Sequence, residues 1–168
     1  LPTVPRGVPG APALIGGDCS RGYRQTLHRV RQAPKLGGSL SFPGFGRGEE
    51  KAGVLSEAWG LALPSHQENF GVVVLEAIAA GLPVVISGEV QLRSFVEDHE
   101  LGIVVDRTDP KSIAEGIISM LKNDSWRQSI TEKGPAAIEN TFSVERIGAQ
   151  LREMYEQACR RSRSNVAA

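Results

Sequence analysis

The chain has 168 residues, 40% of them hydrophobic and 23% charged, a composition that is ordinary for one globular domain. Its 19 basic and 19 acidic side chains cancel, so nothing global attracts nucleic acid or an anionic membrane, and no apolar run approaches the about 20 residues of a membrane-spanning helix. The two cysteines, Cys19 and Cys159, lie far apart without metal-ligand spacing, which disfavours a metal site or a disulfide framework and indicates a cytoplasmic protein.

Short apolar runs alternate with helical patterns along most of the chain. Residues 1–12 contain four prolines and are expected to form an irregular arm. A single domain is predicted to follow at 13–160, with a tail at 161–168. Strands are expected at 13–15, 40–42, 61–63, 84–86 and 102–105, and helices at 18–33, 49–58, 71–80, 91–98, 109–121, 125–140 and 144–160.

The segment 71–80 is ambiguous by periodicity, because its first half has the composition of a strand and its second half that of a helix. Gly81 is a favoured helix stop, and a strand would leave no room for the turn before the strand at 84–86. We therefore predict one helix here.

Two other helices carry specific expectations. Within the helix at 49–58 we expect Val54 and Leu55 to face the core. In the helix at 125–140 we expect Pro135 to cause a kink or a break.

The alternation of strands and helices predicts the fold class. Short apolar strands separated by helices indicate an α/β domain with a Rossmann-like parallel sheet, flanked by helices on both faces. In such sheets ligands bind beyond the carboxyl ends of the strands. That rule places five segments at the working edge, namely 16–17, 43–48, 64–71, 87–90 and 106–109.

The segment 64–71 carries the densest functional signal, because it joins a strand end to a helix start at this edge. The first N–H groups of the helix lack partners within the helix and carry partial positive charge, so they form a site for a phosphate. Gly71 lets the backbone approach a ligand closely. Glu68 precedes the helix and Glu76 lies within it. Since a phosphate would repel them, each carboxylate is expected to accept hydrogen bonds from sugar hydroxyls.

These residues resemble a known family. Residues 64–87 read PSHQENFGVVVLEAIAAGLPVVIS and are similar to the nucleotide-sugar site of retaining GT-B glycosyltransferases (group 1, or family 4), which include sucrose-phosphate synthases, lipopolysaccharide core transferases and bacterial mannosyltransferases. The shared pattern is two glutamates separated by seven residues, with Phe-Gly shortly after the first, here Glu68, Phe70, Gly71 and Glu76. The flanking segments also resemble the family, so the similarity covers about residues 13–158.

The resemblance implies a role for each matching residue. Glu68 would bind hydroxyls of the donor sugar and steady charge as the bond to phosphate breaks, and Glu76 would hold the ribose hydroxyls. The donor would be a UDP-, GDP- or ADP-sugar, with no cofactor and no obligatory metal, and the helix dipole and cationic side chains would meet the leaving-group charge. The substrate contacts are expected at Pro43, Gly44, Phe45, Ser65, His66, Asn69, Phe70, Gly71, Val72 and Val73.

Two departures from the family pattern limit this expectation. The family has an earlier Gly-Arg…Lys-Gly block that clamps the diphosphate, and an N-terminal acceptor-binding domain. Since the chain starts after both, we expect a C-terminal donor-binding fragment that is inactive alone. Residues 88–91 read Gly-Glu-Val-Gln where the family often has Gly-Gly, so the contacts of that loop stay open.

Several alternatives remain beside this hypothesis. A noncatalytic nucleotide-sugar-binding module would keep the Glu76 contacts without needing Glu68. A nicotinamide-dependent oxidoreductase domain would need a glycine fingerprint that residues 15–18 do not supply. Trp59 and Trp126 are expected to be core aromatics rather than sugar platforms. The basic residues Arg152, Arg160, Arg161 and Arg163 favour a solvated helix end, with a weak membrane-surface contact as the alternative.

Overall fold

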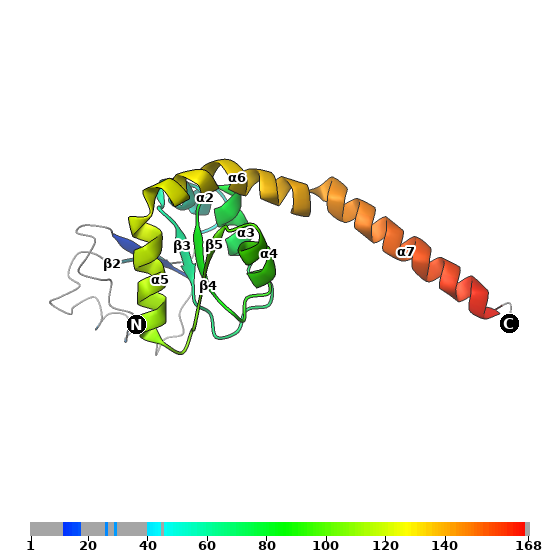
Figure 1. Ribbon diagram of the computed structural model, residues 1–168, viewed down its shortest axis with the longest axis horizontal. Coiled ribbons are helices and arrows are strands. Elements are labelled where there is room, and N and C mark those ends of the chain that lie inside the picture. Colours follow the sequence, from blue (N-terminus) through cyan, green and yellow to red (C-terminus); the bar gives the residue numbers. More distant parts are fainter. Residues whose placement is uncertain (1–11, 18–25, 27–28, 30–39, 45, 167–168) are drawn as a thin grey trace.

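The computed structural model describes residues 12–17, 26, 29, 40–44 and 46–166 (Figure 1). The predicted arm at 1–12 and the predicted helix at 18–33 lie almost entirely outside these residues. The strands are β1 (Ala13–Gly16), β2 (Leu40–Gly44), β3 (Leu61–Leu63), β4 (Val84–Ser87) and β5 (Gly102–Val105). The helices are α2 (Glu49–Glu57), α3 (Val72–Ala79), α4 (Arg93–Asp98), α5 (Pro110–Lys122), α6 (Asp124–Phe142) and α7 (Val144–Val166).

The strands form two parallel sheets rather than the single sheet that we predicted. One sheet pairs β1 with β2, and the other has the order β3-β4-β5, with Leu61 opposite Val84 and Val84 opposite Gly102. The prediction of an α/β fold with parallel strands and flanking helices is confirmed. The division into two sheets was missed because apolar patterning reports where strands occur but not which strands lie side by side.

The core is built on both faces of β4, whose four residues are all buried. Val84 and Ile86 belong to a cluster that α3, α4 and α6 complete, whereas Val85 belongs to a second cluster with Ile113 and Met120 of α5. This division follows from the two-residue period of a strand, which points successive side chains to opposite faces. Figure 1 shows α5 on one face of this sheet and α3 and α4 on the other.

Two local predictions need correction. Val54 is 40% exposed while Leu55 is buried, because neighbouring helix positions differ by about 100° in direction and only one of the two faces the core. The predicted break at Pro135 does not occur, because α6 is continuous through this residue. Gly134 lies so close to α3 that a Cβ there would stand 2.8 Å from the Ile78 carbonyl oxygen. We infer that packing against α3 holds this helix together across the proline.

Two helix ends also differ from the prediction. The helix α4 begins at Arg93 rather than 91, since turns occupy the preceding residues and the Arg93 amide donates to the Val90 carbonyl at 3.0 Å. The helix α7 continues to Val166 instead of ending at 160, and it projects away from the rest of the molecule (Figure 1). The working edge of the three-stranded sheet is unaffected by either difference.

Candidate functional site

The loop 64–71 is anchored at the carboxyl edge of the three-stranded sheet. It leaves the end of β3, and the buried Ser87 at the end of β4 donates its hydroxyl to the Ser65 carbonyl oxygen at 2.7 Å. A fully buried hydroxyl needs such a partner, because an unpaired one costs free energy. This bond fixes the loop to the neighbouring strand and places the predicted residues Ser65 and His66 at the working edge.

The amino end of α3 lies at the same edge and has the geometry of an anion site. Gly71 adopts the left-handed conformation (φ 81°, ψ 47°), and a Cβ there would meet Val90 Cγ1 at 3.3 Å and Glu68 Cγ at 3.5 Å. The predicted helix at 71–80 is thus confirmed, and its glycine has a steric reason. Within the described part of the chain no side chain caps this helix. The first-turn amides of Val72 and Val73 therefore remain available to a ligand.

The two predicted glutamates lie on either side of this helix start. Glu68 is half-buried in the loop, next to Gly71. Glu76 lies one turn into α3, and its Oε1 accepts from Lys51 Nζ of α2 at 2.6 Å. The second oxygen, Glu76 Oε2, is buried without a hydrogen-bond partner in the described part of the chain. Leaving such an acceptor unpaired costs free energy, which a hydrogen bond from a ligand would recover.

A polar cluster that the sequence did not predict joins the loops after β3, β4 and β5. Arg107 donates from Nη1 to His66 Nδ1 at 2.7 Å, and its Nε lies 2.8 Å from Glu89 Oε1 without the alignment of a hydrogen bond. Because the arginine side chain has only donors, His66 Nδ1 is the acceptor in this contact. The only sequence signal was the position of each residue just after a strand end.

The electrostatics of this cluster appear in two carboxyl groups. The Arg107 guanidinium holds the pKa of Glu89 below its ordinary value of 4.5. The Thr108 hydroxyl and amide, which donate to Asp106 Oδ1 at 2.7 and 2.8 Å, lower the pKa of Asp106 in the same way. Both side chains are therefore anionic at neutral pH.

The remaining predicted residues are distributed around this edge. Asn69 is exposed, and Phe70 is 43% exposed with its ring edge-to-face against Phe142 at 6.4 Å. Gly44 ends β2 with a positive φ of 90°, and its carbonyl accepts from the Gly17 amide at 2.9 Å. Phe45 and the side chain of Pro43 lie outside the described residues. Of the three residues predicted to line the nucleobase pocket, the structure therefore describes Gly44 and the backbone of Pro43.

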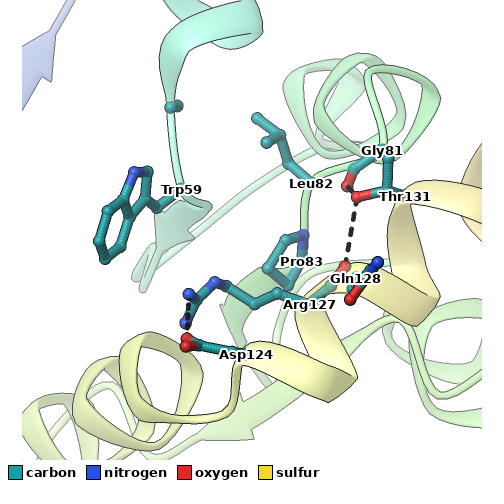
Figure 2. A pocket seen from close by; sticks show the side chains of 9 residues that line it. Trp59, Gly81, Leu82, Pro83, Asp124, Arg127, Gln128 and Thr131 are labelled. Carbon is teal, nitrogen blue, oxygen red and sulfur yellow. Dashed lines mark hydrogen bonds and ion pairs between the residues drawn. The ribbon is translucent and has the colours of Figure 1, made fainter.

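A hollow of about 320 Å³ lies at the opposite, amino end of the three-stranded sheet (Figure 2). Trp59 forms one wall and is 57% exposed, so the prediction of a core aromatic is wrong for this residue, whereas Trp126 packs half-buried against both core clusters. The Arg127 guanidinium lies over the Trp59 ring, 5.0 Å from its centroid, and pairs with Asp124. Figure 2 shows Arg127 between Trp59 and Asp124.

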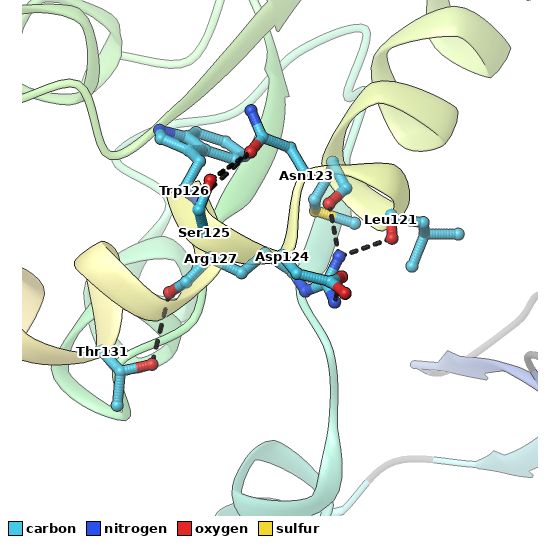
Figure 3. A network of polar contacts seen from close by, with 8 residues as sticks. Leu121, Asn123, Asp124, Ser125, Trp126, Arg127 and Thr131 are labelled. Carbon is cyan, nitrogen blue, oxygen red and sulfur yellow. Dashed lines mark hydrogen bonds and ion pairs between the residues drawn. The ribbon is translucent and has the colours of Figure 1, made fainter.

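The polar groups of this hollow have structural partners. Arg127 Nη1 donates to the Met120 carbonyl at 2.9 Å and also to the Leu121 carbonyl (Figure 3). These carbonyls belong to the last turn of α5, which has no partners for them within the helix. Asn123 Oδ1 accepts from the Trp126 amide at 3.2 Å and so caps α6. We infer that this end of the molecule connects α5 to α6 rather than binding a substrate.

Among the described residues, no group of three or more His, Cys, Asp or Glu side chains is placed to hold a metal ion. Within the same part of the chain, no helix combines the length and the apolar character needed to cross a bilayer.

Comparison with known proteins assigns the chain to a family. A model of the family described as glycosyl transferases group 1 matches residues 4–137. The D-inositol 3-phosphate glycosyltransferase of Salinispora tropica is 29% identical over 156 residues, which cover 92% of this chain and 32% of that protein. The capsular polysaccharide biosynthesis glycosyltransferase CapM of Staphylococcus aureus is 36% identical over 92 residues, which cover 55% of this chain and 24% of that protein.

Solved structures agree with this result. Sucrose-phosphate synthase from Thermosynechococcus elongatus is 28% identical with a TM-score of 0.74, over 86% of this chain and 38% of that one. Anabaena HepE, solved with UDP-glucose, has a TM-score of 0.77 over 89% of this chain and 42% of that one, and at 23% identity it shows the fold alone. The chain thus spans between about a quarter and a third of the length of the curated relatives it matches. Because the family model matches most of its residues, the chain belongs to the group 1 glycosyl transferases.

Proposed function

We propose that this chain is the C-terminal, donor-binding domain of a retaining family 4 glycosyltransferase, which transfers a hexose from a nucleoside-diphosphate sugar to an acceptor hydroxyl. The observation that carries the proposal is the uncapped amino end of α3, which lies at the carboxyl edge of the sheet beside Glu68 and Glu76. An anion site with carboxylates next to it fits a ligand that combines phosphates with hydroxyl groups.

Each part of the donor has a partner in this arrangement. The amides of Val72 and Val73 bind the diphosphate, and the partial positive charge of the helix stabilises the negative charge that the diphosphate gains as it departs. Glu68 accepts from hydroxyls of the hexose, and Glu76 accepts from the ribose. The sugar also contacts the exposed loop residues, and the nucleobase lies against the end of β2. These further contacts come from Ser65, His66, Asn69, Phe70, Gly71, Pro43, Gly44 and Phe45.

The relatives support this donor class. HepE was solved with UDP, with UDP and glucose, and with UDP-glucose, and its fold is the fold of this chain. The helix dipole and cationic side chains would compensate the leaving-group charge without an obligatory metal. Arg107, at the same edge, is one such cation.

The complete enzyme needs more than this chain. Since the chain spans between about a quarter and a third of the length of its relatives, the acceptor is expected to bind a further, N-terminal domain, and the chain alone is expected to transfer little or no sugar. We place the enzyme in the cytoplasm. The basic end of α7, with Arg152 and Arg160, would support a weak contact with the inner membrane surface.

Calorimetric titration of the chain with UDP, GDP, ADP and their hexose conjugates tests the proposal. We expect one nucleoside diphosphate to bind in preference to the others, and the Glu76→Gln variant to bind it at least about tenfold more weakly, because a neutral amide replaces a charged acceptor. Equal or undetectable binding of all three by the folded wild-type chain would contradict the proposal.

A second test separates the transferase from a noncatalytic binding module. In the full-length protein, Glu68→Gln should reduce sugar transfer by about 100-fold, the loss found when one preorganised stabilising group is removed from an active site. Product is measured at saturating donor, so that weaker donor binding does not mimic the effect. Unchanged transfer would exclude a catalytic role for Glu68.

A further inference from the structure

Lys51 connects two helices across the candidate site. It is the third residue of α2, and its ammonium reaches Glu76 of α3, 25 residues along the chain, with Nζ and Oε1 2.6 Å apart. Both side chains are partly exposed, 41% for Lys51 and 33% for Glu76. Ion pairs with this much exposure contribute little to stability. Stabilisation of the fold is therefore a poor explanation for a lysine at this position.

The geometry of the pair leaves one acceptor without a donor. Lys51 engages Oε1 of Glu76, while Oε2 is buried and has no hydrogen-bond partner in the described part of the chain. An ammonium carries three N–H donors, and Oε1 accepts only one of them. The pair thus presents a negative acceptor beside a positive donor.

The chemistry of this combination selects its ligand. A phosphate would be attracted by Lys51 but repelled by Glu76 at the same point. A hydroxyl group is both a donor and an acceptor, so it can donate to Glu76 Oε2 while it accepts from Lys51. Two adjacent hydroxyls, as in the 2′,3′-diol of a ribose, use both groups at once.

We propose that Lys51 is a positioning and specificity residue, which holds Glu76 by one carboxylate oxygen and recognises the ribose diol together with it. This inference rests on the proposed function, because it requires a nucleotide at this edge. It adds a residue of α2 to the site and predicts discrimination between ribose and 2′-deoxyribose. The discrimination arises because a deoxyribose leaves one of the two charged groups without its partner.

The test compares UDP with 2′-deoxy-UDP, and GDP with 2′-deoxy-GDP, by calorimetric titration of the 168-residue chain. Lys51→Met should weaken binding of the preferred ribonucleotide by about tenfold and binding of its deoxy analogue by less than about twofold, since a hydrogen bond to a charged group is lost only with the diol. Lys51→Arg, which keeps a cationic donor, should restore part of the ribose preference.

Lys133→Met is the matched control. Lys133 pairs with Glu100 at 3.4 Å and is 36% exposed, but this pair lies at the amino end of β5, away from the site. It should leave both affinities within about twofold of wild type. Thermal unfolding of each variant shows whether the fold is intact.

The possible outcomes separate this inference from the proposed function. If the wild-type chain binds no nucleoside diphosphate, both are wrong. If it binds one but has no ribose preference, or if Lys51→Met keeps the wild-type preference, the role of Lys51 is wrong while the donor site stands. Equal weakening of ribo and deoxy forms would make Lys51 a phosphate contact or a structural residue, which also overturns the inference.

Discussion

The two ends of the three-stranded sheet both contain charged side chains, but these differ in whether their polar atoms have hydrogen-bond partners. At the amino end, Arg127 donates to the last carbonyls of α5, pairs with Asp124 and stacks on Trp59 (Figures 2 and 3). At the carboxyl edge, Glu76 Oε2 and Arg107 Nε are buried without hydrogen bonds. These are the two such side-chain atoms found in the described part of the chain.

Whether the polar groups have partners distinguishes a structural region from a candidate binding site better than the presence of a hollow does. The amino end has a clear hollow of about 320 Å³, yet its arginine is already used to complete a helix end. The carboxyl edge holds the carboxylate oxygen Glu76 Oε2, which is buried without a hydrogen-bond partner in the described part of the chain, and keeping such a group buried costs free energy that a ligand would recover. This unsatisfied oxygen, rather than the hollow, therefore marks the site where a ligand is expected.

Removing Arg127 should have the largest effect and should act on stability alone. Arg127→Ala leaves the Met120 and Leu121 carbonyls without their donor and exposes one face of Trp59. We expect the free energy of unfolding to fall by about 2–3 kcal/mol, as for other lost hydrogen bonds to a charged group. Denaturant unfolding measures this, and nucleotide affinity at a temperature where the variant is folded should stay within about twofold.

Removing Glu76 should have the converse effect. Glu76→Ala should weaken nucleoside-diphosphate binding by about 30-fold, because two charged acceptor oxygens are lost, while stability changes little. Calorimetric titration measures the affinity. Asp124→Asn is the control from the amino end, and an equal loss of affinity in that variant would remove the distinction between the two ends.

Gly71→Ala tests the start of α3. An alanine at φ 81° is strained, and its Cβ would stand 3.3 Å from Val90 Cγ1. We expect a loss of about 1–2 kcal/mol in the free energy of unfolding, together with weaker nucleotide binding. Gly53→Ala is the control, since that glycine lies inside α2 with open space around it and should gain about 0.5–1 kcal/mol.

The pH dependence of the Glu89–Arg107 pair should give the smallest effect. Because the folded pKa of Glu89 is depressed, the pair stabilises the wild type at neutral pH and this contribution is lost as the pH falls through the folded pKa, below 4.5. Wild type should therefore be slightly more stable than Glu89→Gln at pH 7, and the two should converge in acid. Unfolding curves across this range measure the difference, and a gap that widens in acid would contradict the assignment.

Sequence reasoning worked best where the determinants are local. The helix 71–80 was predicted from Gly81 and from the space before β4, and the strand positions from short apolar runs. The family resemblance drew attention to Glu68 and Glu76, whose positions the fold now gives. These features depend on residues a few positions apart, so a single sequence contains enough information to predict them.

Long-range side-chain contacts could not be predicted in this way. Lys51 meets Glu76 across 25 residues and Arg107 meets His66 across 41, and neither contact has a local pattern. The exposure of Trp59 was missed for the same reason, since its environment is made by Arg127 of a distant helix. The separation into two sheets likewise depends on which strands adjoin, and hydrophobic patterning does not encode that.

A crystal structure of the chain with its preferred nucleoside diphosphate is the most direct measurement of the central claim. We expect diphosphate oxygens within hydrogen-bond distance of the Val72 and Val73 amides, with the ribose hydroxyls against Glu76. A nucleotide bound instead in the hollow between Trp59 and Arg127, with the start of α3 empty, would contradict it.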